Sequence, residues 1–120
     1  MQYMLLIYGE ERVRESRSDA EWESLYQGYA RLSSDLRDQH KLLAGEELQP
    51  TATATTVQVR ADDAIVTDGP VADAQEALGG FFLIEADSLD EAIEWAGRIP
   101  SARDGTIEVR PVVDHSEYGA

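Results

Sequence analysis

Two Ser-x-x-Glu sequences constrain the fold of this chain more than any other feature. One runs from Ser18 to Glu21 and the other from Ser88 to Glu91, and an apolar stripe follows each of them. In such a capping box the Ser side chain accepts the Glu backbone N–H, while the Glu side chain returns to the Ser N–H, which marks a helix start. The apolar spacing of three and four residues predicts one helix to about His40 and a second helix that Pro100 stops.

The remaining segments have strand character, with short apolar or Thr- and Val-rich runs between turn residues. We expect strands at residues 1–8, 42–48, 51–60, 64–67, 81–85 and 106–113. The turn at residues 61–63 joins two of them into a hairpin, and residues 10–17 are expected to form a loop. Gly79-Gly80 is interpreted as backbone freedom before a strand.

This order predicts an α+β domain with a ferredoxin-like β-α-β-β-α-β pattern and an extra hairpin strand. Both helices should cover one face of an antiparallel sheet. We expect one domain over residues 1–113 and a loose tail over residues 114–120.

Apolar residues on both sheet faces predict an uncovered surface. Alternation within single strands assigns the following residues to one face: Tyr3, Leu5, Ile7, Val57, Val59, Phe81, Leu83 and Ile107. It assigns a second set to the other face: Met4, Leu6, Tyr8, Phe82, Ile84 and Val109. The chain is too short for a third layer, so we expect a homodimer that forms through the sheet.

The charge composition argues against several classes of partner. With 24 acidic and 10 basic residues, the net charge of -14 repels nucleic-acid phosphates and anionic membrane surfaces. Such acidity is typical of a solubility adaptation or a high-salt proteome, and a cationic partner is the alternative. Without cysteine and with only two histidines, the chain is expected to hold no metal, and no organic cofactor is implied.

The N-terminal segment lacks the basic start of a signal peptide, and no apolar run approaches the length of a membrane-spanning helix. These observations predict a cytoplasmic protein.

Several segments together resemble the YCII-related family, in its DGPF branch. The matching residues are Tyr8-Gly9, residues 44–57, Thr67-Asp68-Gly69-Pro70, Glu76, residues 78–84 and Glu108-Val109-Arg110-Pro111. The resemblance runs over residues 1–113 and implies a ferredoxin-like fold that dimerises through its sheets, with a cleft beside the sheet. One departure is Val71, which stands where the family usually has Phe.

The resemblance implies more than one class of function. Distant relatives of similar fold include small isomerases and dehalogenating enzymes, and a His–Asp pair is suspected in the founding branch. Many members of the DGPF branch look linked to extracytoplasmic-function sigma factors, which implies a regulatory role for some of them.

Two acidic positions are candidate catalytic groups. Asp68 follows a strand and precedes Gly69-Pro70, so it is either a general base in a cleft within reach of Arg110 or a turn-forming residue. Of Glu46 and Glu47, one must point inward if the segment is extended, and Glu46 is the candidate partner of Asp68. The alternative is that Glu46 and Glu47 are both solvated charges on an edge strand.

Three further residues complete the predicted site. Arg110 is a candidate clamp for a substrate carboxylate, or else one half of a structural ion pair. His40 is a candidate proton shuttle, or else a cation at a helix end. Tyr8 ends the first strand, and its hydroxyl needs a partner if it is buried.

These residues favour a dimeric protein that binds a small organic acid and transfers protons through carboxylates, as isomerases or lyases do. The alternative is a non-catalytic regulatory or partner-binding protein linked to sigma-factor-type transcription control.

Overall fold

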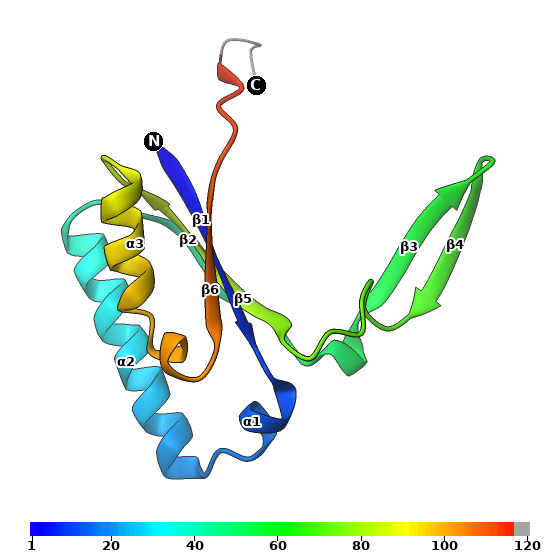
Figure 1. Ribbon diagram of the computed structural model, residues 1–120, viewed down its shortest axis with the longest axis horizontal. Coiled ribbons are helices and arrows are strands. Elements are labelled where there is room, and N and C mark those ends of the chain that lie inside the picture. Colours follow the sequence, from blue (N-terminus) through cyan, green and yellow to red (C-terminus); the bar gives the residue numbers. More distant parts are fainter. Residues whose placement is uncertain (117–120) are drawn as a thin grey trace.

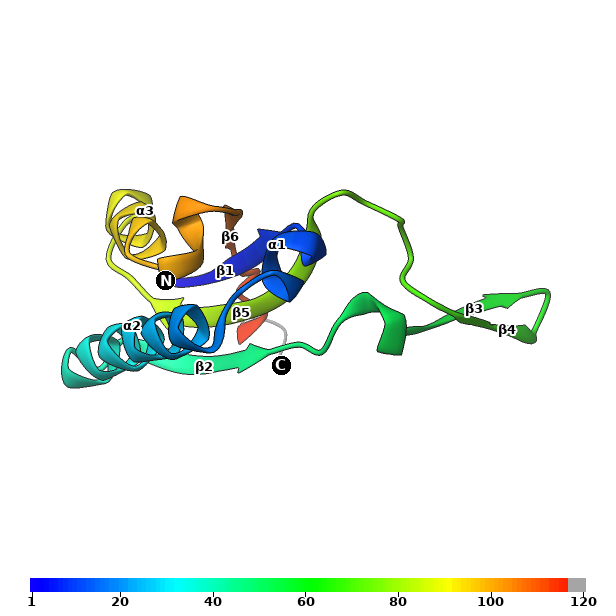
Figure 2. The ribbon, with the colours of Figure 1, turned by 90° about the horizontal axis from the view of Figure 1, so that it is seen from below.

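The computed structural model describes residues 1–116 and contains a four-stranded antiparallel sheet (Figure 1). Its strands lie in the order β2 (Leu42–Glu47), β5 (Ala77–Glu85), β1 (Gln2–Gly9) and β6 (Thr106–Pro111). The helices α2 (Asp19–Asp38) and α3 (Leu89–Gly97) lie on one face of this sheet (Figure 2). The β-α-β-β-α-β order confirms the predicted ferredoxin-like α+β fold.

The strand register decides which residues form the core. Leu5 pairs with Phe82 and Tyr3 pairs with Ile84, and all four are buried beneath the helices. The predicted division of the faces was therefore wrong, because it put Phe82 and Ile84 opposite Tyr3 and Leu5. Alternation within one strand does not reveal the register between strands, and a shift of one residue exchanges the two faces.

The other face of the sheet is not covered by either helix, and we call it the open face. Its centre consists of Met4, Leu6, Phe81 and Leu83, all of them only partly buried. The register places Glu46 beside Phe81 on one rim, and Glu108 and Arg110 on the other rim.

Both helices begin at the predicted Ser residues, but the second cap differs from the first. Ser18 and Glu21 form the reciprocal capping box. Ser88 accepts the backbone N–H of Glu91, whereas the Glu91 carboxylate binds the backbone N–H of Asp87 and the Lys41 ammonium. This carboxylate thus connects α3 to the segment just before β2.

The hairpin lies outside the main sheet. Its strands β3 (Thr55–Arg60) and β4 (Asp63–Asp68) form a separate two-stranded sheet that projects away from the body (Figures 1 and 2). The expected strand over residues 51–60 is shorter, because Thr51–Thr53 forms the 3-10 turn η1. The radius of gyration of 16.5 Å exceeds the value of about 14 Å for a compact domain of this length.

Two connecting segments also differ from the sequence-based expectation. Residues Glu11–Glu15 form the short helix α1 inside the expected loop, and the Glu11 carboxylate accepts hydrogen bonds from the backbone N–H and the hydroxyl of Thr51. Gly79 and Gly80 lie within β5, which already begins at Ala77. The predicted loose tail includes residues 117–120, which lie outside the described residues.

Within the described part of the chain, the structure has no helix that is both long enough and apolar enough to span a membrane.

Candidate functional site

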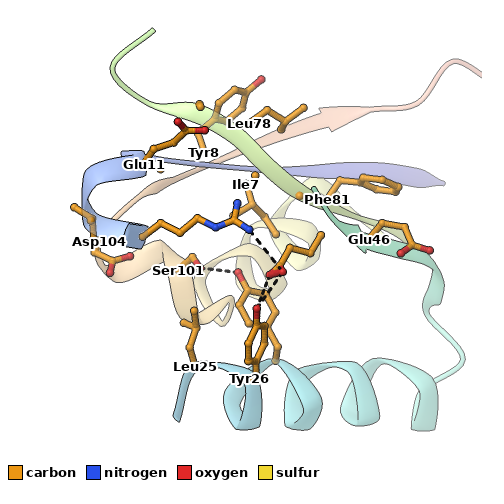
Figure 3. Close-up of a pocket in the computed structure, with 18 of the residues that line it drawn as sticks. Ile7, Tyr8, Glu11, Leu25, Tyr26, Glu46, Leu78, Phe81, Ser101 and Asp104 are labelled. Atoms are coloured by element: carbon orange, nitrogen blue, oxygen red, sulfur yellow. Dashed lines mark hydrogen bonds and ion pairs between the residues drawn. The ribbon is translucent and has the colours of Figure 1, made fainter. Parts of the chain in front are cut away.

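A cavity of about 300 Å³ lies between the N-terminal half of α2 and the sheet. The ends of β1 and β2, the helix α1 and the 3-10 turn η2 (Pro100–Arg103) also contribute to its walls (Figure 3). We call it the α1–α2 cavity.

The cavity exists because the apolar stripe of α2 has different partners along its length. In the C-terminal half of α2, Leu32 and Leu36 are fully packed in the core. In the N-terminal half the stripe continues as Trp22, Leu25, Tyr26 and Tyr29, and the facing strands contribute Gly45 and Gly80 to the cavity wall. At Gly45 an added Cβ would lie 2.8 Å from the Phe82 ring, and at Gly80 it would lie 2.8 Å from the Glu46 carbonyl oxygen, so both glycines permit close packing beside the cavity.

Aromatic rings and guanidinium groups form one wall of the cavity. Trp22 stacks on Tyr26 with ring centroids 5.5 Å apart, and Tyr29 stacks on Phe82 at 6.1 Å. The guanidinium carbons of Arg17 and Arg14 lie 5.1 Å and 5.9 Å from the centroid of Trp22. These distances are those of cation–π contacts, so the indole helps to hold both cations at the cavity.

A carboxylate, a phenol and a guanidinium meet at the edge of the cavity near β2. The Tyr26 hydroxyl lies 3.1 Å from both Glu47 oxygens, and Arg14 Nη2 lies 3.8 Å from Glu47 Oε1. Arg14 Nη1 also donates to the carbonyl of Leu48 at 3.0 Å. Burial and the hydrogen bond to Glu47 raise the pKa of Tyr26, so at neutral pH this phenol keeps its proton and donates a hydrogen bond to the carboxylate.

A second polar group lies where α2 meets η2. The Tyr29 and Ser101 hydroxyls are 2.7 Å apart, and burial raises the pKa of Tyr29. Arg17 Nη2 binds Asp104 at 3.0 Å, and the Arg17 side chain is only 13% exposed. Because a guanidinium has several N–H donors, both Arg14 and Arg17 keep donor capacity beyond these bonds.

The structure contains no cluster of three or more His, Cys, Asp or Glu positioned to bind a metal within residues 1–116. The absence of a metal and of a cofactor stays a prediction.

Comparison with known proteins places this architecture in a family. The family model of the YCII-related domain matches residues 1–116, which include the cavity and the hairpin. The chain belongs to the YCII-related family. It is 36% identical over 114 residues to an uncharacterized protein of Rhizobium meliloti (strain 1021), and the match covers 93% of this chain and 92% of that protein.

Three of the residues predicted for the site lie elsewhere in this YCII-related chain. Asp68 is exposed at the end of β4, and the cavity wall does not include it. Arg110 lies on β6 next to Met4, on the open face. His40 is exposed just beyond α2 with a φ of 58°, in the left-handed region. The single chain therefore does not bring Asp68 into a cleft with Arg110, because the hairpin carries Asp68 away from the main sheet.

Glu46 and Tyr8 border the cavity but lie on the other face of the sheet. Figure 3 shows Tyr8 beside Leu78, on the side of the sheet away from Tyr26. Glu46 pairs with Phe81 of the open face, whereas the Glu47 carboxylate reaches Tyr26 on the helix side. Both glutamates are exposed on the edge strand β2, as the solvated alternative expected, and the one that reaches Tyr26 is Glu47 and not the chosen candidate Glu46.

The sequence reasoning missed the two arginines and the role of the aromatic stripe. Arg14 and Arg17 belong to the segment expected to be a loop, and Trp22, Tyr26 and Tyr29 belong to the apolar stripe that predicted the first helix. The available signal was the run of large aromatic residues in the first half of the helix, compared with leucines in the second half.

Proposed function

We propose that this chain binds a small organic acid with a flat apolar body in the α1–α2 cavity. The supporting observation is the placement of Arg14 and Arg17 against Trp22 in a cavity with aromatic walls. Aromatic faces favour a planar apolar body, and guanidinium groups with spare N–H donors favour a carboxylate. The volume suits a ligand of metabolite size.

The charges around the cavity favour an acid over an amine. Of the five acidic residues that line the cavity, four already have partners: Glu47 has Tyr26 and Arg14, Asp104 has Arg17, Glu11 has Thr51, and Glu10 has Arg12. The fifth, Glu46, lies on the other face of the sheet. Two guanidinium groups already lie over the Trp22 ring, so a ligand ammonium would meet like charges there. A ligand carboxylate would instead use guanidinium N–H groups that remain available.

Glu47 and Tyr26 form the pair that would transfer a proton if the chain is an enzyme. The Glu47 carboxylate can take a proton from the carbon next to the keto group of a 2-oxo acid while the Tyr26 phenol gives its own proton to the keto oxygen. The proton on Glu47 then returns to Tyr26, 3.1 Å away, and the product is the enol. The substrate loses one proton and gains one, as in an isomerisation, so the reaction needs no cofactor. In this proposal Glu47 has the proton-transfer role that the sequence analysis gave to Asp68 and Glu46.

Three probes that contain the same benzyl group test binding. Phenylacetate should raise the thermal unfolding temperature and shift backbone NMR signals of residues at the cavity, because a ligand of the folded state stabilises it. 2-Phenylethanol, without the charge, and phenethylammonium, with the opposite charge, should act more weakly. Equal effects of all three probes would contradict recognition of an acid.

Variants assign this binding to the cavity. Arg14→Gln should weaken phenylacetate binding at least about tenfold, since a charge-assisted hydrogen bond contributes about 1.5–3 kcal/mol. Asp68→Asn is the matched control, because it removes a charge outside the cavity wall and should leave the affinity unchanged. A loss of binding in Asp68→Asn would return this residue to the site.

Proton transfer is tested separately with phenylpyruvate in deuterated water. An enzyme should accelerate exchange of the methylene hydrogens, and Glu47→Gln should abolish the exchange while phenylpyruvate still binds. Binding without accelerated exchange would favour the alternative, in which the chain senses a ligand as a regulatory protein.

A further inference from the structure

Two hydroxyl groups lie side by side among the aromatic rings that line the α1–α2 cavity (Figure 3). The Tyr29 and Ser101 oxygens are 2.7 Å apart, although 72 positions separate the two residues in the sequence. Tyr29 comes from α2, where its ring stacks on Phe82, and Ser101 comes from η2. The fold therefore brings two neutral polar groups together in a wall that is otherwise apolar at this point.

This hydroxyl pair has a hydrogen-bonding capacity that the described residues do not use. Two hydroxyls carry two hydrogens, and each oxygen also accepts hydrogen bonds. The bond between Tyr29 and Ser101 uses one hydrogen, whichever oxygen donates it. The other hydrogen has no acceptor within residues 1–116. A ligand oxygen beside the pair would accept this hydrogen, whereas an apolar ligand atom there would leave it unpaired at a cost in binding free energy.

The pair is suited to a neutral ligand group and not to a charged one. Burial raises the pKa of Tyr29, so the phenol keeps its proton at neutral pH. Together the two hydroxyls offer one donor and several acceptor positions. A ligand hydroxyl has the same combination, so it can accept the spare hydrogen and donate its own hydrogen to the pair.

The hydroxyl pair lies at a distance from the arginines that suits a ligand with polar groups at both ends. Trp22, which both guanidinium groups contact, precedes Tyr29 by seven residues. Seven residues are two helical turns, or about 10.5 Å along the axis of α2. Beyond Tyr29 the stripe is closed by the buried Leu32, so Tyr29 marks the inner end of the cavity. A flat ligand with its acid group at the arginines therefore directs its other end toward the hydroxyls.

We propose that the cavity binds aryl acids with a hydroxyl group on the ring opposite the acid side chain, and that Tyr29 and Ser101 select this hydroxyl. The inference rests on the proposed function, because it requires the acid group to lie at Arg14 and Arg17. A site that hydrogen-bonds a ligand hydroxyl discriminates against an analogue without it, because the polar groups of the site are then left unpaired.

The test compares 4-hydroxyphenylacetate with 4-methylphenylacetate, which has a methyl group of similar size in place of the hydroxyl. Dissociation constants are measured by NMR titration of the full chain, with phenylacetate as the reference for binding of the acid. Wild-type protein should bind the 4-hydroxy compound at least about fivefold more tightly than the 4-methyl compound, because the methyl group leaves the hydroxyl pair without a partner.

A double variant assigns this preference to the pair. Tyr29→Phe with Ser101→Ala removes both hydroxyls, and replacement of both hydrogen-bond partners by apolar groups can be nearly neutral for stability. In this variant the preference for the 4-hydroxy compound should disappear or reverse. Thr106→Val is the matched control, because it removes a hydroxyl that binds Glu76 outside the cavity wall, and it should keep the preference.

The outcomes separate this inference from the proposed function. If wild-type protein binds none of the three acids, the acid site itself is wrong. If phenylacetate binds but the 4-hydroxy compound has no advantage over the 4-methyl compound, only the selection by Tyr29 and Ser101 is overturned. A preference that persists in the double variant, with its fold checked by circular dichroism, would overturn it as well. If the double variant does not fold, Ser101→Ala alone decides, and it should reduce the preference at least about twofold.

Discussion

At the residue scale, Gly80 shows why the sheet needs a glycine beside the cavity. A Cβ atom at Gly80 would lie 2.8 Å from the carbonyl oxygen of Glu46, on the neighbouring strand β2. Backbone atoms of a paired strand cannot move aside as a flexible side chain can. The glycine therefore permits a close approach of the two strands, and it is not simply a source of flexibility before a strand.

Two alanine substitutions at adjacent positions test this interpretation. Gly80→Ala should lower the free energy of unfolding by about 1–3 kcal/mol, the usual cost of overpacking. At Gly79 the nearest atom to a new Cβ is 3.9 Å away, so Gly79→Ala should be neutral or stabilise by up to about 1 kcal/mol. Chemical denaturation of both variants measures the difference, and equal stabilities would refute the close-approach argument.

The residue scale is also where sequence reasoning failed most clearly. Leu42 faces the helices opposite Ile84, but the register then shifts, so Ala44 pairs with Leu83 of the open face. This irregularity reverses the alternation and turns Glu47, not Glu46, toward the cavity. A bulge inserts one unpaired residue, and simple alternation along a sequence does not reveal it.

At the element scale, the Glu91 carboxylate connects α3 to the sheet. It accepts hydrogen bonds from the Lys41 ammonium, the backbone N–H of Asp87 and the Trp95 indole N–H. The Lys41 ammonium lowers the pKa of Glu91 most, and in return Glu91 raises the pKa of Lys41. The capping pattern predicted where α3 begins, but the long-range partner of its Glu depends on packing and is not visible in the sequence.

This network predicts a pH-dependent contribution to stability. Because folding lowers the pKa of Glu91, its stabilisation is fully present above its ordinary pKa of 4.5 and is lost as the pH falls through the lower value of the folded state. Glu91→Gln should therefore unfold at a lower temperature than wild-type protein at neutral pH, and the gap should narrow on acidification below 4.5. Glu94→Gln, at an exposed position of the same helix, is the control. If the difference in unfolding temperature between wild-type protein and Glu91→Gln stays constant with pH, the charge of Glu91 does not cause the stabilisation.

At the scale of the whole molecule, the sequence predicted the order of the helices and strands but not the position of the hairpin. Caps and periodicities place two helices among β segments, and right-handed packing rules leave few ways to arrange them. The hairpin strands at Val57 and Val66 have the same local pattern as strands of the main sheet. The Gly69–Ala54 hydrogen bond joins the two arms to each other at their base, and no local sequence signal shows that the arms leave the main sheet there.

The net charge predicts how salt should affect the dimer expected from the uncovered sheet face. Two copies with a charge of -14 each repel one another, and added salt screens this repulsion, since the Debye length falls from about 10 Å at 0.1 M to about 3 Å at 1 M. The dimer dissociation constant should therefore decrease as NaCl rises, when measured by sedimentation equilibrium. Glu46→Gln with Glu108→Gln, on the two rims of the open face, should reduce this dependence, whereas Glu23→Gln on the exposed side of α2 should change it less. A dissociation constant that increases with salt would mean that opposite charges, rather than apolar faces, hold the two copies together.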